Sequence, residues 1–344
     1  MVDIFCILST KLHNTQGMTT TAIIGCAGYS GQETLDRVLS HPALEPVALG
    51  SDSLAGLPAS ALDPRLAAAD LPAFVTNDDA LASGAELIFL CLSHEQAAAV
   101  VTPADAVIID LSGAHRLHDP SLYTDWYGWA HPLPTALAAW SYALPELFPP
   151  EGRLIANPGC YATAALLALA PLAGAIHESG VVVDAKSGVS GAGRALKASS
   201  HAGSVLENVA PYRVGTHQHA PEIAQGLGFP VCFVPHLLPV RRGLLATCYV
   251  RATEPDLRER LEAAYAATPA VLLLPEGVSP ELARVAGTDA AEVALFQDQA
   301  TDTAIVICAL DNLGKGAAGQ AVQNANLALG LDETMGLRLQ GVMV

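Results

Sequence analysis

Cys160 is the residue of this sequence best suited to covalent chemistry. It follows an Asn-Pro-Gly turn and stands where a long run of alanine and leucine begins. Unpaired N–H groups at the start of a helix carry partial positive charge, so we expect this site to favour the thiolate over the thiol. Because the thiolate is the nucleophile, Cys160 is a candidate catalytic residue. The alternative is a buried structural cysteine, which packs as a small hydrophobe.

Two histidines, His217 and His219, are candidates for proton transfer. They precede a predicted helix in which Pro221 and Glu222 suit the first turn. Imidazole exchanges protons near neutral pH, so either could act as general acid or base. An H-x-H pair can also bind zinc, but the sequence offers no third and fourth ligand at suitable spacing, and we predict no metal site. A solvent-exposed pair without a role is the remaining alternative.

The first element that could position a ligand is a glycine-rich turn. Residues 19–25 are β-branched and apolar, glycines follow at positions 25, 28 and 31, and a helical run covers residues 33–40. A strand, a glycine turn and a helix in this order predict a dinucleotide site, in which backbone N–H groups hold a pyrophosphate. The spacing G-x-x-G-x-x-G differs from the usual G-x-G-x-x-G. A glycine-rich turn without a ligand is the alternative.

Short apolar runs continue this pattern along the first half of the chain. They lie at residues 46–49, 86–92 and 106–111 and alternate with alanine-rich helical segments, which predicts a Rossmann-type, doubly wound parallel sheet. Ligands bind at the carboxyl ends of such strands, where Ser93-His94 and Asp110-Leu111-Ser112 lie. Arg116 follows on the connecting loop. It could hold a phosphate, although a surface ion pair is the common role of a loop arginine.

The pattern changes after residue 180, where we expect a second domain. Strand candidates lie at residues 181–187, 231–235, 244–251, 271–274 and 304–310, with few helices between them, which favours a mixed or antiparallel sheet in an α+β domain. The final run, residues 316–329, is predicted to be a helix that Gly330 ends. With 344 residues the chain exceeds the usual size of one core, which also favours two domains.

Composition excludes several classes of protein. A net charge of −17 argues against a nucleic-acid surface, and no apolar run is long enough for a membrane span. The seven cysteines are scattered without a C-x-x-C pair, which favours a reducing, cytoplasmic location over a disulfide framework or a zinc ribbon. Residues 1–17 have no positive charge at their start and only a short apolar stretch, so we expect a loose extension and no signal peptide.

Several long motifs, in a fixed order, resemble the N-acetyl-gamma-glutamyl-phosphate reductase family of arginine biosynthesis. They are GCAGYSGQE at 25–33, DLSGAHRLHDPSLYTDWYG at 110–128, IANPGCYAT at 155–163, DAKSGVSGAGR at 184–194, ENVAPYRVGTHQHAPEI at 207–223 and DNLGKGAAGQAVQNANL at 311–327. Together they span most of the chain, which is far more specific than any single motif.

The resemblance implies a fold like that of glyceraldehyde-3-phosphate and aspartate-semialdehyde dehydrogenases. Residues 18–157 and 316–344 would form the Rossmann domain, and residues 158–315 an inserted α+β catalytic and oligomerisation domain. The implied reaction is the NADPH-dependent reduction of N-acetyl-L-glutamyl 5-phosphate to the 5-semialdehyde and phosphate, through a cysteinyl thioester, in a homodimer or homotetramer. Cys160 would be the nucleophile, and His219, in preference to His217, the acid/base.

The resemblance and the strand positions also imply further site residues. Ser112 and Arg116 would contact the phosphate, and the other expected substrate-binding residues are Asn157, Lys186, His217 and Glu222. The expected cofactor-binding residues are Gly25, Ala27, Gly28, Tyr29, Ser30, Gly31, Ser51, Ser53, Ser93, His94, Ser187, Gly188, Asn312 and Lys315. Two stretches depart from the family pattern, namely Gly113-Ala114-His115 and Gly287-Thr288-Asp289.

Asp52 conflicts with the cofactor that the resemblance implies. It follows the second predicted strand, and no Arg or Lys occurs between Arg37 and Arg65. A carboxylate near the adenosine ribose suits NAD and repels the 2′-phosphate of NADP, whereas Ser51 and Ser53 could donate to that phosphate if Asp52 turns outward. We therefore predict that NADPH is used, with a weaker preference over NADH than an arginine would give.

Two other functions stay open at this point. A sister reductase acts on the aminoadipyl phosphate, often on a carrier protein, and the extra methylene discriminates by only about 1–3 kcal/mol. The intact stretches Asn157–Cys160 and Lys186–Gly188, together with the acidic composition, favour the glutamyl substrate. A nucleotide-binding regulator without turnover is disfavoured by the joint presence of Cys160, His219 and Arg116.

Overall fold

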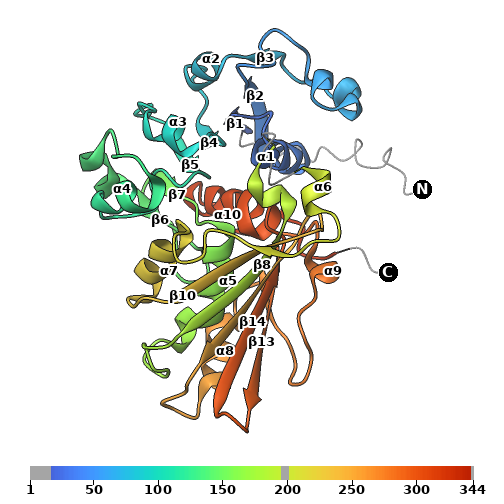
Figure 1. The fold of residues 1–344 in the computed structure, drawn as a ribbon. Coiled ribbons are helices and arrows are strands. Elements are labelled where there is room, and N and C mark those ends of the chain that lie inside the picture. Colours follow the sequence, from blue (N-terminus) through green and yellow to red (C-terminus); the bar gives the residue numbers. More distant parts are fainter. Residues whose placement is uncertain (1–16, 195–200, 342–344) are drawn as a thin grey trace.

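The computed structural model describes residues 17–194 and 201–341, and this part of the chain forms two seven-stranded sheets. Figure 1 shows the first sheet at the top and the second below it, with helix α10 (Gly319–Ala328) between them. The expected N-terminal extension lies outside the described residues except for Gly17.

The first sheet is parallel throughout, in the order β3-β2-β1-β4-β5-β7-β6. Its strands are β1 (Thr19–Ile24), β2 (Leu44–Gly50), β3 (Phe74–Val75), β4 (Leu87–Leu90), β5 (Val107–Asp110), β6 (Ser141–Tyr142) and β7 (Leu154–Ala156). The central strand β4, Leu-Ile-Phe-Leu, is buried at every position, as a strand covered on both faces should be. The predicted Rossmann-type sheet is confirmed, while β3 and β6 are too short to leave a recognisable pattern in the sequence.

Both faces of this sheet are covered. On one face, Leu35 and Val38 of α1 (Tyr29–Ser40) pack with Val322 of α10 against the strands, and on the other Ala80 of α2 (Asn77–Leu81) does so. The shorter helices α3 (His94–Ala98) and α4 (Ser121–Tyr127) follow β4 and β5. A π-helical turn over Gly314–Ala318 leads into α10, so the C-terminal helix returns to the first domain.

The second sheet is mixed, in the order β12-β13-β14-β11-β8-β10-β9. Its strands are β8 (Val182–Gly188), β9 (Ala210–Pro211), β10 (Cys232–Leu238), β11 (Leu244–Val250), β12 (Val271–Leu273), β13 (Ala291–Asp298) and β14 (Thr303–Leu310). Pairs β8–β10 and β12–β13 are parallel, and the other pairs are antiparallel. The five expected strands are present, and the sequence analysis missed β9 and β13.

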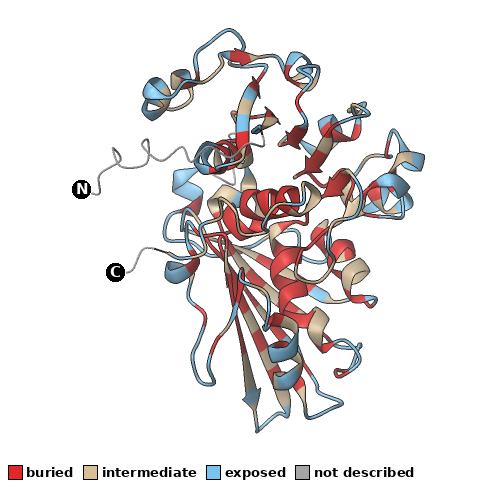
Figure 2. Cartoon of the chain, turned by 180° about the vertical axis from the view of Figure 1, so that it is seen from behind, coloured by how far each residue is buried: buried red, intermediate tan, exposed pale blue. Residues whose placement is uncertain are grey.

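Helices cover one face of this second sheet. The main ones are α5 (Cys160–Leu169), α7 (His219–Leu227) and α8 (Leu257–Tyr265), while α6 (Ala202–Val205) and α9 (Leu282–Val285) are single turns. Every residue of α5 after Cys160 is buried, which explains a helix that is apolar on all sides. In Figure 2 both α5 and α10 are coloured largely as buried. The opposite face is open, because Thr247 and Tyr249 of β11 are partly exposed where Ala246 and Cys248 are buried.

Ion pairs fasten α1 to the second domain, and one of them is fully buried. Arg37 Nη2 lies 2.7 Å from Asp289 Oδ1, and neither side chain is exposed. Glu33 pairs with Arg242, which also bonds Asp311 through Nε at 2.8 Å. Removing one partner would leave a buried charge without compensation, so these contacts fix how the two domains meet.

Candidate active site

Cys160 stands at the first position of α5, where the two domains join. Gly159 before it is extended (φ −74°, ψ 151°), and its carbonyl accepts the first helical hydrogen bond from Thr163 at 2.8 Å. Glycine is needed here because a Cβ on Gly159 would overlap His219 Nε2. A Cβ on Gly316 would lie 2.8 Å from Cys160 Cβ. The turn therefore lets the histidine and the C-terminal segment approach the cysteine closely.

His219 begins α7 and is buried beside Arg116. Its Nε2 lies 3.5 Å from Arg116 Nη1, and both atoms border Gly159. The Nδ1 of His217 accepts a hydrogen bond from the backbone N–H of His219 at 3.1 Å. His219 therefore presents its ring to the cysteine turn, while His217 supports the first residue of the helix.

Glu222, one turn further along α7, is fully buried behind this turn. Its Oε1 accepts hydrogen bonds from the N–H of Gly159 at 2.8 Å and from the hydroxyl of Tyr142 at 2.9 Å. Its Oε2 lies 3.5 Å from Arg116 Nη1 and 4.0 Å from His219 Nε2. The carboxylate thus holds the backbone before the cysteine and neutralises the charge of Arg116.

Arg116 and Asn157 are held mainly by backbone groups. Arg116 donates from Nε to the carbonyl of Asn157 and from Nη2 to that of Leu111, both at 2.8 Å. The side-chain oxygen of Asn157 accepts from Asn324 of α10 at 3.0 Å, and its Nδ2 donates to Ala317 at 3.2 Å. The predicted substrate residue Asn157 therefore fastens the cysteine turn to the C-terminal helix.

Burial sets the protonation of the site. It raises the pKa of the Cys160 thiol to about 11, although Arg116 and nearby backbone N–H groups act in the opposite direction. The expectation that the helix start alone would favour the thiolate is therefore wrong for this site. Burial, His217 and Arg116 together push the pKa of His219 well below its usual range, and burial lowers that of His217 to about 3. At neutral pH the site holds a thiol beside a neutral imidazole, which can accept the thiol proton.

Two of the predicted substrate residues have their polar groups engaged elsewhere. The hydroxyl of Ser112 donates to Asp110 at 2.9 Å and accepts from the N–H of Ala114 at 3.0 Å. Lys186 points to the partly open face of the second sheet, where its ammonium bonds Asp184 at 2.5 Å. The structure brings Arg116, Asn157, Glu222 and both histidines to the cysteine turn, and it does not bring the Lys186 side chain there.

The glycine-rich turn borders a cavity of about 290 Å³ at the carboxyl end of the first sheet. Its lining residues are Gly25, Ala27, Gly28, Ser51, Asp52, Ser53, Asn77, Cys91, Leu92, Ser93 and Gln96. Gly25 has φ +78°, and a Cβ on Gly31 would lie 2.5 Å from its carbonyl oxygen, so both glycines are required by the turn. Tyr29 and Ser30 begin α1 beside it. This cradle, a strand end facing a helix start, fits a dinucleotide.

The remaining predicted cofactor residues lie in three different places. His94 begins α3, where its Nδ1 accepts from the N–H of Gly113 at 2.8 Å. Ser187 and Gly188 end β8, close to Asn312, whose Nδ2 donates to Ser190 at 2.9 Å. Lys315 is different, because its ammonium is completely buried between Glu146 at 2.5 Å and Gln323 at 2.7 Å. The structure thus places the Lys315 side chain in the core and away from the cofactor cradle.

Asp52 lines the cofactor cavity, and both of its carboxylate oxygens already accept hydrogen bonds. Its two oxygens accept hydrogen bonds from Asn77, one from the backbone N–H at 2.9 Å and one from Nδ2 at 2.8 Å. The Asn77 Oδ1 in turn accepts from the N–H of Gly25 at 2.9 Å. Ser51 and Ser53 contact each other at 3.3 Å. The carboxylate therefore stays at the cavity wall as part of a chain of bonds that ends at the glycine turn.

In each of the two stretches that depart from the family pattern, one side chain contacts another residue of the chain. His115 Nδ1 lies 2.6 Å from Asp110 Oδ2, and its ring stacks on Trp140 with centroids 3.8 Å apart. Asp289 pairs with Arg37, as described above. Sequence reasoning missed Tyr142 and Asn77, which lie far from any motif. It also gave Gly159 no role of its own, although a glycine directly before a candidate nucleophile is a signal of close approach.

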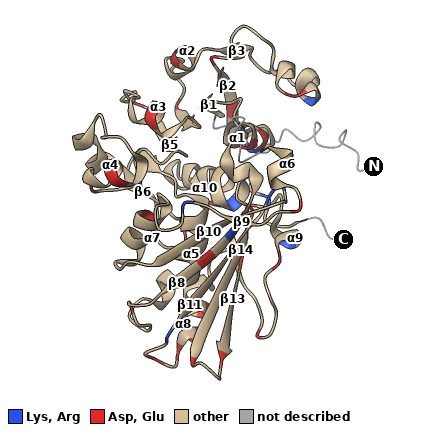
Figure 3. Ribbon diagram, in the orientation of Figure 1, with Lys and Arg blue, Asp and Glu red and all other residues tan. Residues whose placement is uncertain are grey.

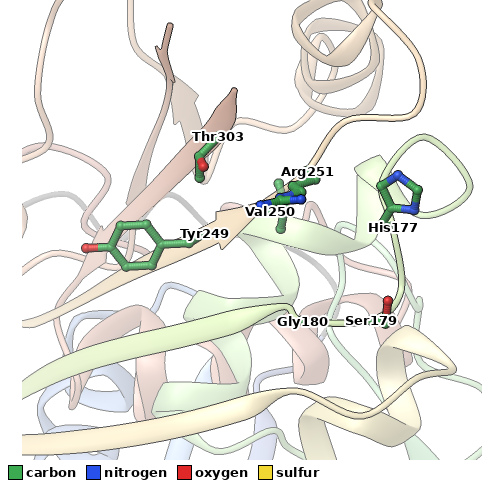
Figure 4. Close-up of a pocket in the computed structure, with 7 residues that line it drawn as sticks. All are labelled: His177, Ser179, Gly180, Tyr249, Val250, Arg251 and Thr303. Atoms are coloured by element: carbon green, nitrogen blue, oxygen red, sulfur yellow. The ribbon is translucent and has the colours of Figure 1, made fainter. Parts of the chain in front are cut away.

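A second cavity, of about 490 Å³, lies away from the cysteine turn. It is lined by His177, Ser179, Gly180, Tyr249, Val250, Arg251 and Thr303 (Figure 4). These residues border the start of β8 and β14 and the end of β11, whereas the cysteine turn faces the opposite ends of these strands. Within the described residues no group of three or more His, Cys, Asp or Glu side chains could hold a metal ion. No helix in the same part of the chain is long and apolar enough to cross a membrane.

Comparison with known proteins gives consistent results. The family described as semialdehyde dehydrogenase, NAD binding domain, matches residues 20–154, and its dimerisation domain matches residues 160–312. The chain is 45% identical over 332 residues to the N-acetyl-gamma-glutamyl-phosphate reductase of Salinispora arenicola, covering 93% of this chain and 98% of the relative. It is 42% identical over 341 residues to the protein of the same name from Pelotomaculum thermopropionicum, covering 93% and 98%.

Solved structures show the same fold at lower identity. Aspartate semialdehyde dehydrogenase II from Vibrio cholerae superimposes with a TM-score of 0.69 at 18% identity, covering 92% of this chain and 99% of that one. A probable aspartate-semialdehyde dehydrogenase from Pseudomonas aeruginosa gives a TM-score of 0.64 at 20% identity, with 91% and 99% covered. These likenesses establish the architecture of the two domains.

Proposed function

Since the chain belongs to the N-acetyl-gamma-glutamyl-phosphate reductase family, we propose that it reduces N-acetyl-L-glutamyl 5-phosphate to N-acetyl-L-glutamate 5-semialdehyde and phosphate. The observation that carries the proposal is the arrangement around Gly159. Cys160 follows it directly, while His219 Nε2 and Arg116 Nη1 both border it. A nucleophile, a proton acceptor and a cation therefore converge on one turn.

The first half of the reaction uses these groups in order. The neutral imidazole of His219 takes the thiol proton of Cys160, and the thiolate sulfur attacks the acyl carbon. The bond from that carbon to the phosphate oxygen breaks and releases phosphate, which leaves a thioester. Arg116 offers positive charge to the phosphate as it leaves. The N–H groups in the first turn of α5 can donate to the developing oxyanion.

The second half returns the cysteine to its starting state. When bound, the reduced nicotinamide supplies the hydride that converts the thioester to a thiohemiacetal. The protonated His219 stabilises the alkoxide as it forms. Collapse of the thiohemiacetal breaks the carbon–sulfur bond, releases the aldehyde and leaves Cys160 to be protonated again. Glu222 acts as a positioning residue, because it bonds the Gly159 N–H and lies close to Arg116.

The cofactor is a nicotinamide dinucleotide, and we propose NADPH with a weak preference over NADH. Support for the weak preference comes from the 290 Å³ cavity, whose lining contains the carboxylate of Asp52 and no Lys or Arg. Ser51 and Ser53 line the same cavity, and their hydroxyls could donate to a 2′-phosphate.

The dimerisation domain supports a homo-oligomer, for which we propose a dimer or tetramer. The partly open face of the second sheet, with Thr247 and Tyr249 among its residues, suits such contacts. A cytoplasmic location is proposed from the biosynthetic role and from the unpaired state of the six described cysteines.

The test compares two semialdehydes in the reverse direction. Enzyme, phosphate and oxidised cofactor are mixed with either N-acetylglutamate semialdehyde or the one-carbon-longer aminoadipate analogue, while reduced nicotinamide is followed by absorbance. We expect the higher kcat/KM for the glutamate compound. A higher value for the longer compound would assign the chain to the sister reaction, and no turnover of either would refute the proposal.

A further inference from the structure

Arg194 reaches from the second domain to the glycine-rich turn of the first. It lies after β8, at the end of the loop that follows Gly188, and its Nη1 donates to the carbonyl of Ala27 at 2.8 Å. Ala27 belongs to the turn that lines the 290 Å³ cavity. Arg194 is exposed, and among the described residues no carboxylate forms an ion pair with it. Within the described part of the chain, the guanidinium is therefore held beside the cavity by one neutral acceptor.

The cavity itself lacks positive charge. Its lining includes Asp52 and no Lys or Arg, and Figure 3 shows acidic residues but no basic ones on the neighbouring helices α2 and α3. Some backbone donors of the turn are already occupied, because the N–H of Gly25 bonds Asn77 and that of Gly28 bonds the Gly25 carbonyl at 3.1 Å. The two negative charges of a pyrophosphate would therefore meet the partial positive charge at the start of α1, while no Lys or Arg side chain in the cavity lining compensates them.

The other arginines that contact α1 are committed to carboxylates. Arg37 bonds Asp289 and Glu33, and Arg242 bonds Glu33 and Asp311. Arg338 pairs with Asp36 at 2.7 Å. None of these three cations can approach the turn without giving up an ion pair. Arg194 can do so while keeping its bond to Ala27, because a guanidinium carries five N–H donors.

We propose that Arg194 is a ligand of the cofactor's pyrophosphate, supplied to the glycine-rich turn by the catalytic domain. One N–H bonds the carbonyl of Ala27, and the remaining donors bind phosphate oxygens. The dinucleotide then bridges the two domains, because Arg194 belongs to the second domain and the glycine-rich turn to the first. This inference rests on the proposed function only in requiring that a nicotinamide dinucleotide binds.

The test measures dissociation constants of NADPH, NADH and ADP for the full chain by fluorescence or calorimetric titration. Arg194→Ala should raise all three by about tenfold or more, since hydrogen bonds to charged groups are lost. The dissociation constants of Arg194→Lys should lie between those of Arg194→Ala and the wild type, because lysine keeps the charge and lacks the planar guanidinium. The binding of adenosine, which has no phosphate, should not change.

The matched control is Arg260→Ala. This arginine lies on α8 and pairs with Asp256 of the same segment, so the variant loses the same charge far from the turn. Its dissociation constants should equal those of the wild type. Equal weakening by both variants would mean a general charge effect and would overturn the proposal. If Arg194→Ala weakens the binding of NADPH alone, Arg194 contacts the 2′-phosphate and the proposal is overturned. Unchanged binding of all three ligands by Arg194→Ala would also overturn it. Failure of the wild type to bind any dinucleotide would instead refute the proposed function.

Discussion

Arg116 Nη1 lies 3.5 Å from His219 Nε2, so a permanent cation borders the residue proposed to carry the proton. The cation contributes to the lowered pKa of His219, together with burial and His217. It also lowers the pKa of Cys160, against the larger effect of burial. One guanidinium thus lowers both pKa values, which keeps the imidazole neutral and eases ionisation of the thiol.

Replacing the nucleophile should abolish turnover without unfolding the protein. Cys160→Ser should lower kcat by about 10³-fold or more, because a serine hydroxyl is not ionised by this neutral imidazole at pH 7. Cofactor binding should be retained. Mass spectrometry of the wild type with acyl phosphate, in the absence of reduced cofactor, should show an acyl adduct on Cys160. An adduct on another cysteine, or near-normal activity of the serine variant, would contradict the assignment.

The two histidines should differ in their contribution. His219→Asn should lower kcat by about 10²–10⁴-fold with nucleotide affinity unchanged, because a positioned proton carrier is lost. His217→Asn keeps an acceptor near the backbone N–H of His219 and should cost less. Steady-state kinetics of both variants, with nucleotide titrations, make the comparison. A larger loss from His217→Asn would mean that the wrong member of the pair was chosen.

The thiol should react faster as the pH rises. Since the pKa of Cys160 is raised to about 11, the thiolate fraction should grow by about tenfold per pH unit between pH 7 and pH 9. The rate of inactivation by iodoacetamide should follow it. Cys160→Ser provides the background, because Cys232 is exposed and will also be alkylated. A rate that is already constant below pH 7 would indicate a preformed thiolate–imidazolium pair, contrary to this expectation.

Gly159 should not tolerate a side chain. In Gly159→Ala the new Cβ would overlap His219 Nε2 and lie 2.7 Å from Arg116 Nη1, so both side chains must shift. Because a small displacement of catalytic groups is costly, kcat/KM should fall by about 10²-fold. Thermal unfolding should show a folded protein, with a loss of about 1–3 kcal/mol from overpacking. Gly203→Ala is the control, since a Cβ there meets nothing within 4 Å, and it should leave both quantities unchanged.

Asp52 should set the cofactor preference. Asp52→Ser and Asp52→Arg should each raise the ratio of kcat/KM for NADPH over NADH, because they remove a negative charge from the cavity wall. Asp78→Ser is the matched control, an exposed carboxylate of α2 that does not line the cavity, and it should leave the ratio unchanged. A wild type that is strongly specific for NADPH, with a ratio unaffected by either Asp52 substitution, would show that this carboxylate does not face the ribose.

Local sequence patterns predicted most of the helices and strands. The alternation of apolar runs and alanine-rich segments specified the parallel sheet, because a strand buried on both faces must be continuously apolar, as β4 is. The Asn-Pro-Gly-Cys turn located the start of α5 at Cys160. Short edge strands such as β6 (Ser141–Tyr142) were missed because two residues carry no periodicity.

Only the tertiary structure decided the electrostatics and the direction of each side chain. The sequence places Cys160 at a helix start, where partial positive charge should ionise it, but desolvation by the surrounding protein outweighs that charge and raises its pKa. Lys315 lies in a motif beside Gly316. Its ammonium nevertheless forms an ion pair in the core with Glu146, some 170 residues earlier in the chain. Such partners meet only through folding, since contacts between residues distant in sequence follow from how the domains pack. The same holds for Arg194 and Ala27, which belong to different domains.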